Sequence, residues 1–114
     1  MKIITYPDIQ KMINDGEKIL LIDLRDYEEY ARHHIDDSIN IPEEKFIQMM
    51  DEEDKMFNEI TCMYREGYNI ILYCMRGNIS MIIAEKMGMH EIETFSLYGG
   101  INEFDKYVRY EKSV

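Results

Sequence analysis

A chain of 114 residues has room for one hydrophobic core, and its 46% apolar and 32% charged content is ordinary for a folded domain, so we expect a single domain over residues 1–114. The net charge of −10 excludes the basic face that a nucleic-acid-binding protein needs. The apolar runs are far shorter than the roughly 20 residues that cross a bilayer, and no secretory signal is visible, so we expect no membrane contact and a cytoplasmic location.

The first half of the chain alternates strand-like and helix-like segments. Residues 3–5 predict a strand, followed by a helix that begins near Pro7 and ends at Gly16. Residues 18–23 form an apolar run ending in Asp23, which is typical of a buried parallel strand with a polar residue at its carboxyl end. The expected elements that follow are a helix over 27–33, a strand over 38–41 and two helices within 43–65, broken near Asp51.

The second half continues the alternation. Residues 69–73 predict a buried strand, and Ser80 is expected to open a helix that Gly88 ends. A strand over 93–97 and a helix over 101–110 complete the pattern. This order predicts an α/β domain with a mainly parallel sheet.

One cysteine, Cys74, lies at the carboxyl end of a predicted buried strand, where ligands bind in open α/β sheets. A tight glycine-containing loop and a helix start follow it. Inward-facing loop amides and the positive end of the helix dipole both favour a thiolate over a thiol. Residues 26–66 carry 13 acidic and 4 basic side chains, but residues 67–114 carry 6 and 5. The half of the chain that contains Cys74 is therefore nearly neutral, and we expect that it need not repel a small anion.

The second cysteine, Cys62, lies in a helical stretch and is expected to pack or to lie at the surface. It forms no short-spaced pair with Cys74, and no histidine completes a zinc set. The three histidines, His33, His34 and His90, are expected at the surface or in caps. The sequence therefore predicts neither a metal site nor a disulfide.

Four groups of residues resemble, in the correct order, the signatures of rhodanese-like domains. They comprise residues 21–26 with 29–31, residues 34–35 with 38–42, residues 73–80, and residues 97–101, and so extend over most of the chain. The resemblance implies a three-layer α/β/α fold around a five-stranded, mainly parallel sheet of order 1-5-4-2-3, flanked by helices.

The resemblance also implies sulfur transfer by double displacement. Cys74 would attack the outer sulfur of a thiosulfate-like anion or another persulfide donor, and with thiosulfate sulfite would leave. The persulfide would then pass its sulfur to cyanide, a thiol or a protein acceptor. Because sulfite is already a good leaving group, the chemistry needs anion stabilisation rather than a cofactor or a general acid.

Site residues carry over from the resemblance position by position. Cys74 is the expected catalytic residue, and the expected substrate-binding residues are Met75, Arg76, Gly77, Asn78, Ile79 and Ser80. Gly77 allows the loop to curve, Arg76 supplies a nearby positive charge, and Ser80 caps the helix or bonds the thiolate. Asp23 and Arg25 resemble the family's strand-end pair and are expected to organise the neighbouring loop.

The sequence departs from the family pattern in three places. Ile79 stands where many relatives carry Arg or Thr, which removes one anion contact. His33 and Asp37 replace glycines of the second signature, so different turns are expected there. The stretch from Pro42 to Cys74 is longer than in many minimal members, which adds a helix.

One other function remains open alongside sulfur transfer, and a third is not supported by the loop. A rhodanese-like module that binds a partner without catalysis is compatible with Ile79 and the single loop cation. Phosphate or arsenate chemistry on a related loop would need a longer cradle, with cysteine, five residues and then arginine. Position 80 is Ser, so that motif is absent.

Overall fold

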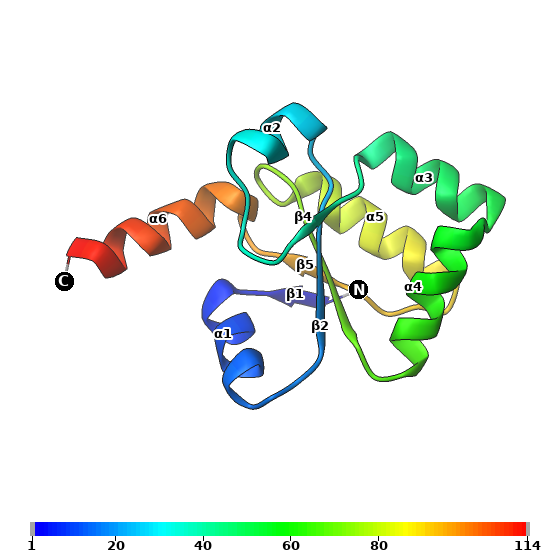
Figure 1. The fold of residues 1–114 in the computed structure, drawn as a ribbon, viewed down its shortest axis with the longest axis horizontal. Helices are drawn as coiled ribbons and strands as arrows, with labels where there is room; N and C mark the ends of the chain where they lie inside the picture. Colours follow the sequence, from blue (N-terminus) through cyan, green and yellow to red (C-terminus); the bar gives the residue numbers. More distant parts are fainter. Residues whose placement is uncertain (1, 114) are drawn as a thin grey trace.

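A five-stranded parallel sheet runs through the computed structural model, which describes residues 2–113 (Figure 1). Its order, β1-β5-β4-β2-β3, confirms the predicted topology, and every pairing is parallel. The strands are β1 (Lys2–Ile4), β2 (Ile19–Asp23), β3 (Ile39–Asn40), β4 (Asn69–Tyr73) and β5 (Phe95–Leu97).

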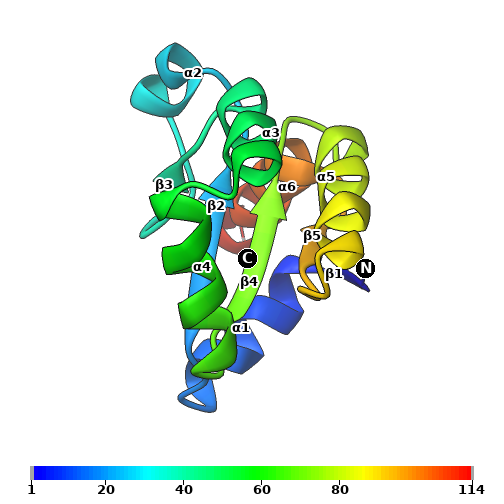
Figure 2. The same cartoon turned by 90° about the vertical axis from the view of Figure 1, so that its right-hand side faces the viewer.

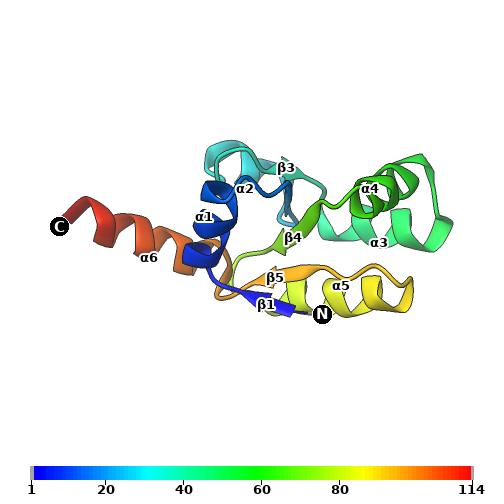
Figure 3. The same ribbon diagram turned by 90° about the horizontal axis from the view of Figure 1, so that it is seen from below.

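Six helices connect the strands or extend beyond the last of them. They are α1 (Tyr6–Asn14), α2 (Tyr27–Arg32), α3 (Glu43–Glu52), α4 (Lys55–Arg65), α5 (Asn78–Met89) and α6 (Gly100–Ser113). Within residues 2–113, none of these helices combines the length and apolar character that a bilayer crossing requires. α6 runs outward from the sheet toward the C-terminus (Figures 1 and 3).

The central strands β2 and β4 divide their side chains between two cores, because successive strand residues point to opposite faces. Ile22 and Leu72 face the core formed with α3, α4 and α5, whereas Leu21 and Ile71 face the core formed with α1 and α6. Figure 2 shows α3, α4 and α5 in front of the sheet and α1 and α6 behind it. The predicted three-layer α/β/α architecture is therefore confirmed.

Three predicted helix boundaries are wrong. The break in the helical stretch falls at Glu53 and Asp54 rather than near Asp51, because Glu53 adopts a left-handed φ of 47° and the Asp54 carboxylate caps α4 by accepting the Phe57 N–H at 3.0 Å. α5 continues past Gly88 to Met89 and begins two residues before Ser80. A glycine at ordinary helical φ does not by itself end a helix.

The carboxyl ends of the parallel strands share one edge of the sheet. Asp23 ends β2, Asn40 ends β3 and Cys74 follows β4, so this edge carries the polar and nucleophilic residues that the sequence singled out. The first turn of α3 is fixed to the same edge, since the N–H of Glu43 donates to the carbonyl of Leu24 at 2.9 Å.

Candidate active site

Cys74 is nearly enclosed, with only 5% of its surface exposed, and two backbone amides point at its sulfur. The N–H of Gly77 donates to Sγ at 3.2 Å and the N–H of Ser80 donates to it at 3.4 Å. Both donors lie at the start of α5, where helix N–H groups have no partner within the helix. This arrangement stabilises a negative charge on the sulfur.

Gly77, rather than Ser80, stands at the N-cap of α5, so the prediction that Ser80 opens the helix is wrong. Gly77 has a φ of 97°, which lets the loop turn into the helix within three residues of Cys74. Ser80 consequently lies inside the first turn of α5, and its side chain is free to face the sulfur.

A buried pair of serines lies beside the sulfur. The Cys74 thiol donates to Ser80 Oγ at 3.6 Å, and Ser80 Oγ lies 2.6 Å from Ser96 Oγ on β5. Ser80 Oγ also donates to the carbonyl of Gly77 at 3.1 Å. Because a hydroxyl can rotate and Ser96 can donate to Ser80, the Ser80 proton can turn to the sulfur once Cys74 ionises. The Ser80 side chain therefore contacts the Cys74 thiol and does not cap α5, and its predicted bond to the thiolate stays a prediction.

The start of α6 is hydrogen-bonded to the backbone of the cysteine loop. The N–H of Ile101 donates to the carbonyl of Cys74 at 3.0 Å, and the N–H of Asn102 donates to that of Met75 at 3.1 Å. Gly100 has a φ of 60°, and a Cβ built there would lie 2.6 Å from the carbonyl carbon and oxygen of Met75. The sequence assigned Gly100 to a signature but not to this role. Consecutive glycines after a predicted strand were the available signal.

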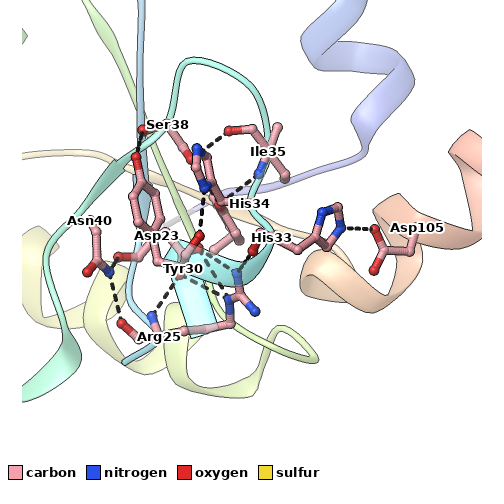
Figure 4. Close-up of polar contacts among 10 residues, drawn as sticks. Asp23, Arg25, Tyr30, His33, His34, Ile35, Ser38, Asn40 and Asp105 are labelled. Atoms are coloured by element: carbon pink, nitrogen blue, oxygen red, sulfur yellow. Dashed lines mark hydrogen bonds and ion pairs between the residues drawn. The ribbon is translucent and has the colours of Figure 1, made fainter. Parts of the chain in front are cut away.

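A buried ion pair organises the neighbouring strand end, as predicted for Asp23 and Arg25 (Figure 4). The Arg25 guanidinium donates to Asp23 Oδ2 at 2.9 Å from Nη2 and at 3.2 Å from Nε, and the Arg25 N–H donates to Asp23 Oδ1 at 2.8 Å. Burial alone would lower the pKa of Arg25, but the hydrogen bond and charge of Asp23 outweigh it and raise that pKa. The guanidinium also donates to the carbonyl of His33 at 2.6 Å, and Asn40 bonds the carbonyls of both residues of the pair.

Tyr73 ties the same loop to β4. Its hydroxyl accepts the N–H of Ile35 at 3.2 Å and lies 3.0 Å from Ser38 Oγ. Burial raises the pKa of Tyr73 above its usual value, so the phenol stays protonated. Tyr73, the residue before the cysteine, thus fixes the loop in which His33 and Asp37 stand at the two positions expected to be glycine. Asp37 adopts a left-handed φ of 68° in this loop, and the His33 ring lies 2.7 Å from Asp105 on α6.

Cys74 lines a cleft of about 280 Å³ that has an unexpected charge. Its apolar lining residues are Leu24, Pro42, Met75 and Ile79, and its charged lining residues are Arg25, Asp26, Glu29, Glu43 and Glu44. Arg25 is already neutralised by Asp23. The expectation that the surroundings of Cys74 would not repel a small anion is therefore wrong, because four carboxylates of the acidic segment 26–66 line the same cleft as the sulfur.

Arg76 and Asn78 lie outside this cleft. They line a second hollow together with Gly77, Tyr98, Gly99 and Glu103 among other residues. Arg76 is exposed. The geometry thus gives no support to Arg76 as the cation that holds a substrate beside Cys74. Met75 and Ile79 line the cleft, and their substrate-binding role stays a prediction. Cys62 is exposed on α4 and lines a separate hollow beside His90.

The fold and the site together define an α/β domain with a cysteine cradled at the carboxyl edge of its parallel sheet. The family model for the rhodanese-like domain matches residues 5–107, and the chain belongs to that family. No curated protein matches the sequence.

Solved structures share this fold at low sequence identity. The human single-domain sulfurtransferase TSTD1 has a TM-score of 0.71 at 18% identity, with 93% of this chain and 96% of that chain covered. BH2092 from Bacillus halodurans has a TM-score of 0.69 at 27% identity, covering 93% and 72%. RPA3614 from Rhodopseudomonas palustris, described as a possible tyrosine phosphatase, has a TM-score of 0.74 at 19% identity, covering 93% and 81%. The similarity to these three structures shows the shared fold and does not assign their activities to this chain.

Proposed function

We propose that this protein is a sulfur carrier or sulfurtransferase in which Cys74 holds a sulfane sulfur as a persulfide. The observation that supports the proposal most directly is the pair of N–H groups, from Gly77 and Ser80, that point at Sγ. A thiolate carries its negative charge on Sγ, so these amides stabilise the attacking thiolate and the thiolate that leaves when the persulfide passes on its outer sulfur. A thiol-reducing compartment such as the cytoplasm keeps Cys74 available.

The reaction proceeds in two displacements. The Cys74 thiolate attacks the outer sulfur of a donor, the bond between the two donor sulfurs breaks, and the remainder of the donor leaves with that electron pair. An acceptor nucleophile, such as cyanide, a thiol or a protein cysteine, then attacks the outer sulfur of the persulfide. The bond to Sγ breaks and Cys74 returns as a thiolate held by the two amides. Neither displacement needs an oxidant or a reductant.

A binding module without turnover is the second candidate function. The acidic lining of the cleft favours this candidate because it opposes the binding of one common sulfur donor, thiosulfate. Thiosulfate is a dianion, and its entry is opposed by four carboxylates that have no ion-pair partner among residues 2–113. A protein that never loads sulfur from any donor, but still binds a partner through this cleft, would have this function.

Phosphate-ester chemistry is not favoured, although one structural neighbour is described as a possible tyrosine phosphatase. In the related phosphate-binding loop, an arginine follows the cysteine after five residues and holds the phosphate. In this chain that position is occupied by the buried Ser80. The acidic lining of the cleft would also repel a phosphate dianion.

Intact-mass measurement tests the proposal. After incubation with an alkanethiosulfonate, whose sulfinate leaves as sulfite leaves from thiosulfate, the protein is expected to gain one sulfur atom and to lose it on treatment with cyanide. Cys74→Ser abolishes the gain, and the matched variant Cys62→Ser keeps it. A gain that survives in Cys74→Ser, or no gain in the unaltered protein, would contradict the proposal.

A further inference from the structure

The charge of the cleft indicates what kind of molecule exchanges sulfur with Cys74. Four carboxylates, those of Asp26, Glu29, Glu43 and Glu44, line the same cleft as the sulfur. They come from two segments of the chain, the start of α2 and the start of α3, which lie together at the edge of the sheet where Cys74 emerges.

These carboxylates are not neutralised by neighbours. Among residues 2–113, no lysine, arginine or histidine lies within ion-pair distance of any of the four. Arg25, the basic residue that lines the cleft, is paired with the fully buried Asp23. The cleft that Cys74 lines therefore carries an excess of negative charge, which favours a positively charged occupant.

Helix stability explains only part of this arrangement. Acidic side chains in a first turn complement the helix dipole, which accounts for Glu29 on α2 and for Glu43 and Glu44 on α3 individually. It does not account for their convergence on the cleft of Cys74. Asp26, at the N-cap of α2, makes no capping hydrogen bond with its side chain, so its charge is available to a molecule in the cleft.

Resting on the proposed function, we propose that Cys74 exchanges sulfur with a cysteine in a lysine- or arginine-rich segment of another protein, which docks on this acidic cleft. Basic side chains flanking the partner cysteine meet the four carboxylates, and the apolar lining from Leu24, Met75 and Ile79 contacts the peptide near the reacting sulfur.

The transfer step balances without a further reagent. The partner's cysteine thiolate attacks the outer sulfur of the Cys74 persulfide, and a new sulfur–sulfur bond forms on the partner. The bond between the outer sulfur and Sγ breaks, and its electron pair stays on Sγ, which the N–H groups of Gly77 and Ser80 stabilise.

Two synthetic peptides, each with one cysteine flanked by lysines or by glutamates, provide the test. Cys74 is first loaded with 2-aminoethanethiosulfonate, a donor without net charge, and sulfur transfer to each peptide is followed by mass. Each rate is normalised to the reaction of that peptide with a small neutral disulfide, which removes intrinsic thiol reactivity. We expect the lysine peptide to react at least about tenfold faster, and the ratio to approach one at ~1 M salt.

Matched variants assign the preference to the cleft. Glu43→Gln/Glu44→Gln removes two charges from the lining and is expected to reduce the rate ratio several-fold. Glu59→Gln/Glu85→Gln makes the same change in net charge at exposed positions on α4 and α5 and is expected to leave the ratio unchanged.

Failure of the inference and failure of the proposed function give different results. If the neutral donor does not load Cys74, both are overturned. If Cys74 loads but the two peptides react at equal normalised rates, or if the two double variants behave alike, the sulfur-carrier function stands and the basic partner is overturned.

Discussion

Replacing Gly100 by alanine is expected to lower the free energy of unfolding by about 2–5 kcal/mol and to abolish sulfur loading at Cys74. The left-handed backbone at a φ of 60° accounts for part of the loss. The larger part arises because the new methyl group would overlap the carbonyl oxygen of Cys74 and lie 2.6 Å from that of Met75. The cysteine loop must then shift, and the two amides no longer converge on the sulfur.

Gly16→Ala is the matched control for this prediction. Gly16 also has a left-handed φ, of 76°, but a Cβ there meets no atom within 4 Å. Its substitution is expected to cost only about 1–2 kcal/mol and to preserve loading. Urea denaturation combined with intact mass after incubation with the donor measures both effects. Equal destabilisation by the two substitutions, or normal loading of Gly100→Ala, would show that Gly100 does not hold the loop.

Asp23→Asn is expected to destabilise the protein by about 3–5 kcal/mol, because it leaves the guanidinium of Arg25 buried without its counter-charge. Asp23 is fully buried and the Arg25 side chain is 7% exposed, so water cannot replace the lost carboxylate. A loss of this size is a large fraction of the stability of a small domain. The loop at His33, which Arg25 also holds, is expected to loosen.

A surface ion pair and a double variant serve as controls. Lys2 Nζ lies 3.5 Å from Glu93 Oε1, and the two side chains are 63% and 48% exposed. Glu93→Gln is therefore expected to lower the free energy of unfolding by less than about 1 kcal/mol. Asp23→Asn/Arg25→Gln is expected to be less destabilised than the sum of its single variants, since neither charge is then left alone. Additive effects in chemical denaturation would argue against a coupled pair.

The architecture was predictable from the sequence because its strongest signals are local. Two continuous apolar runs mark the central strands β2 and β4, and the order of the family signatures implies the sheet order that the structure confirms. Helix boundaries were less predictable. The start of α5 depends on the left-handed φ of Gly77, and α5 continues through Gly88 because that glycine, unlike Gly77, does not adopt a positive φ.

Only the part of the site that lies close to Cys74 in the sequence was predictable. The amides of Gly77 and Ser80 lie within six residues of Cys74, and a strand–loop–helix pattern indicated them. The charge of the cleft was not predictable in this way, because Glu43 and Glu44 are some thirty residues before Cys74 in the sequence. Separate charge counts for residues 26–66 and 67–114 placed these glutamates in a different part of the chain from Cys74. Tertiary folding brings four carboxylates of the acidic segment 26–66 to the cleft that Cys74 lines.

Amide proton shifts of Gly77 and Ser80, followed by nuclear magnetic resonance while Cys74 is titrated, test most directly whether the cradle holds a sulfur anion. Thiolate absorbance, compared with that of Cys74→Ser, reports the ionisation independently. Both amide protons are expected to move together as the thiolate forms, and to stay unchanged over the same pH range in Cys74→Ser. If the thiolate forms while neither amide proton moves, the amides do not hold the charge and the proposed chemistry loses its physical basis.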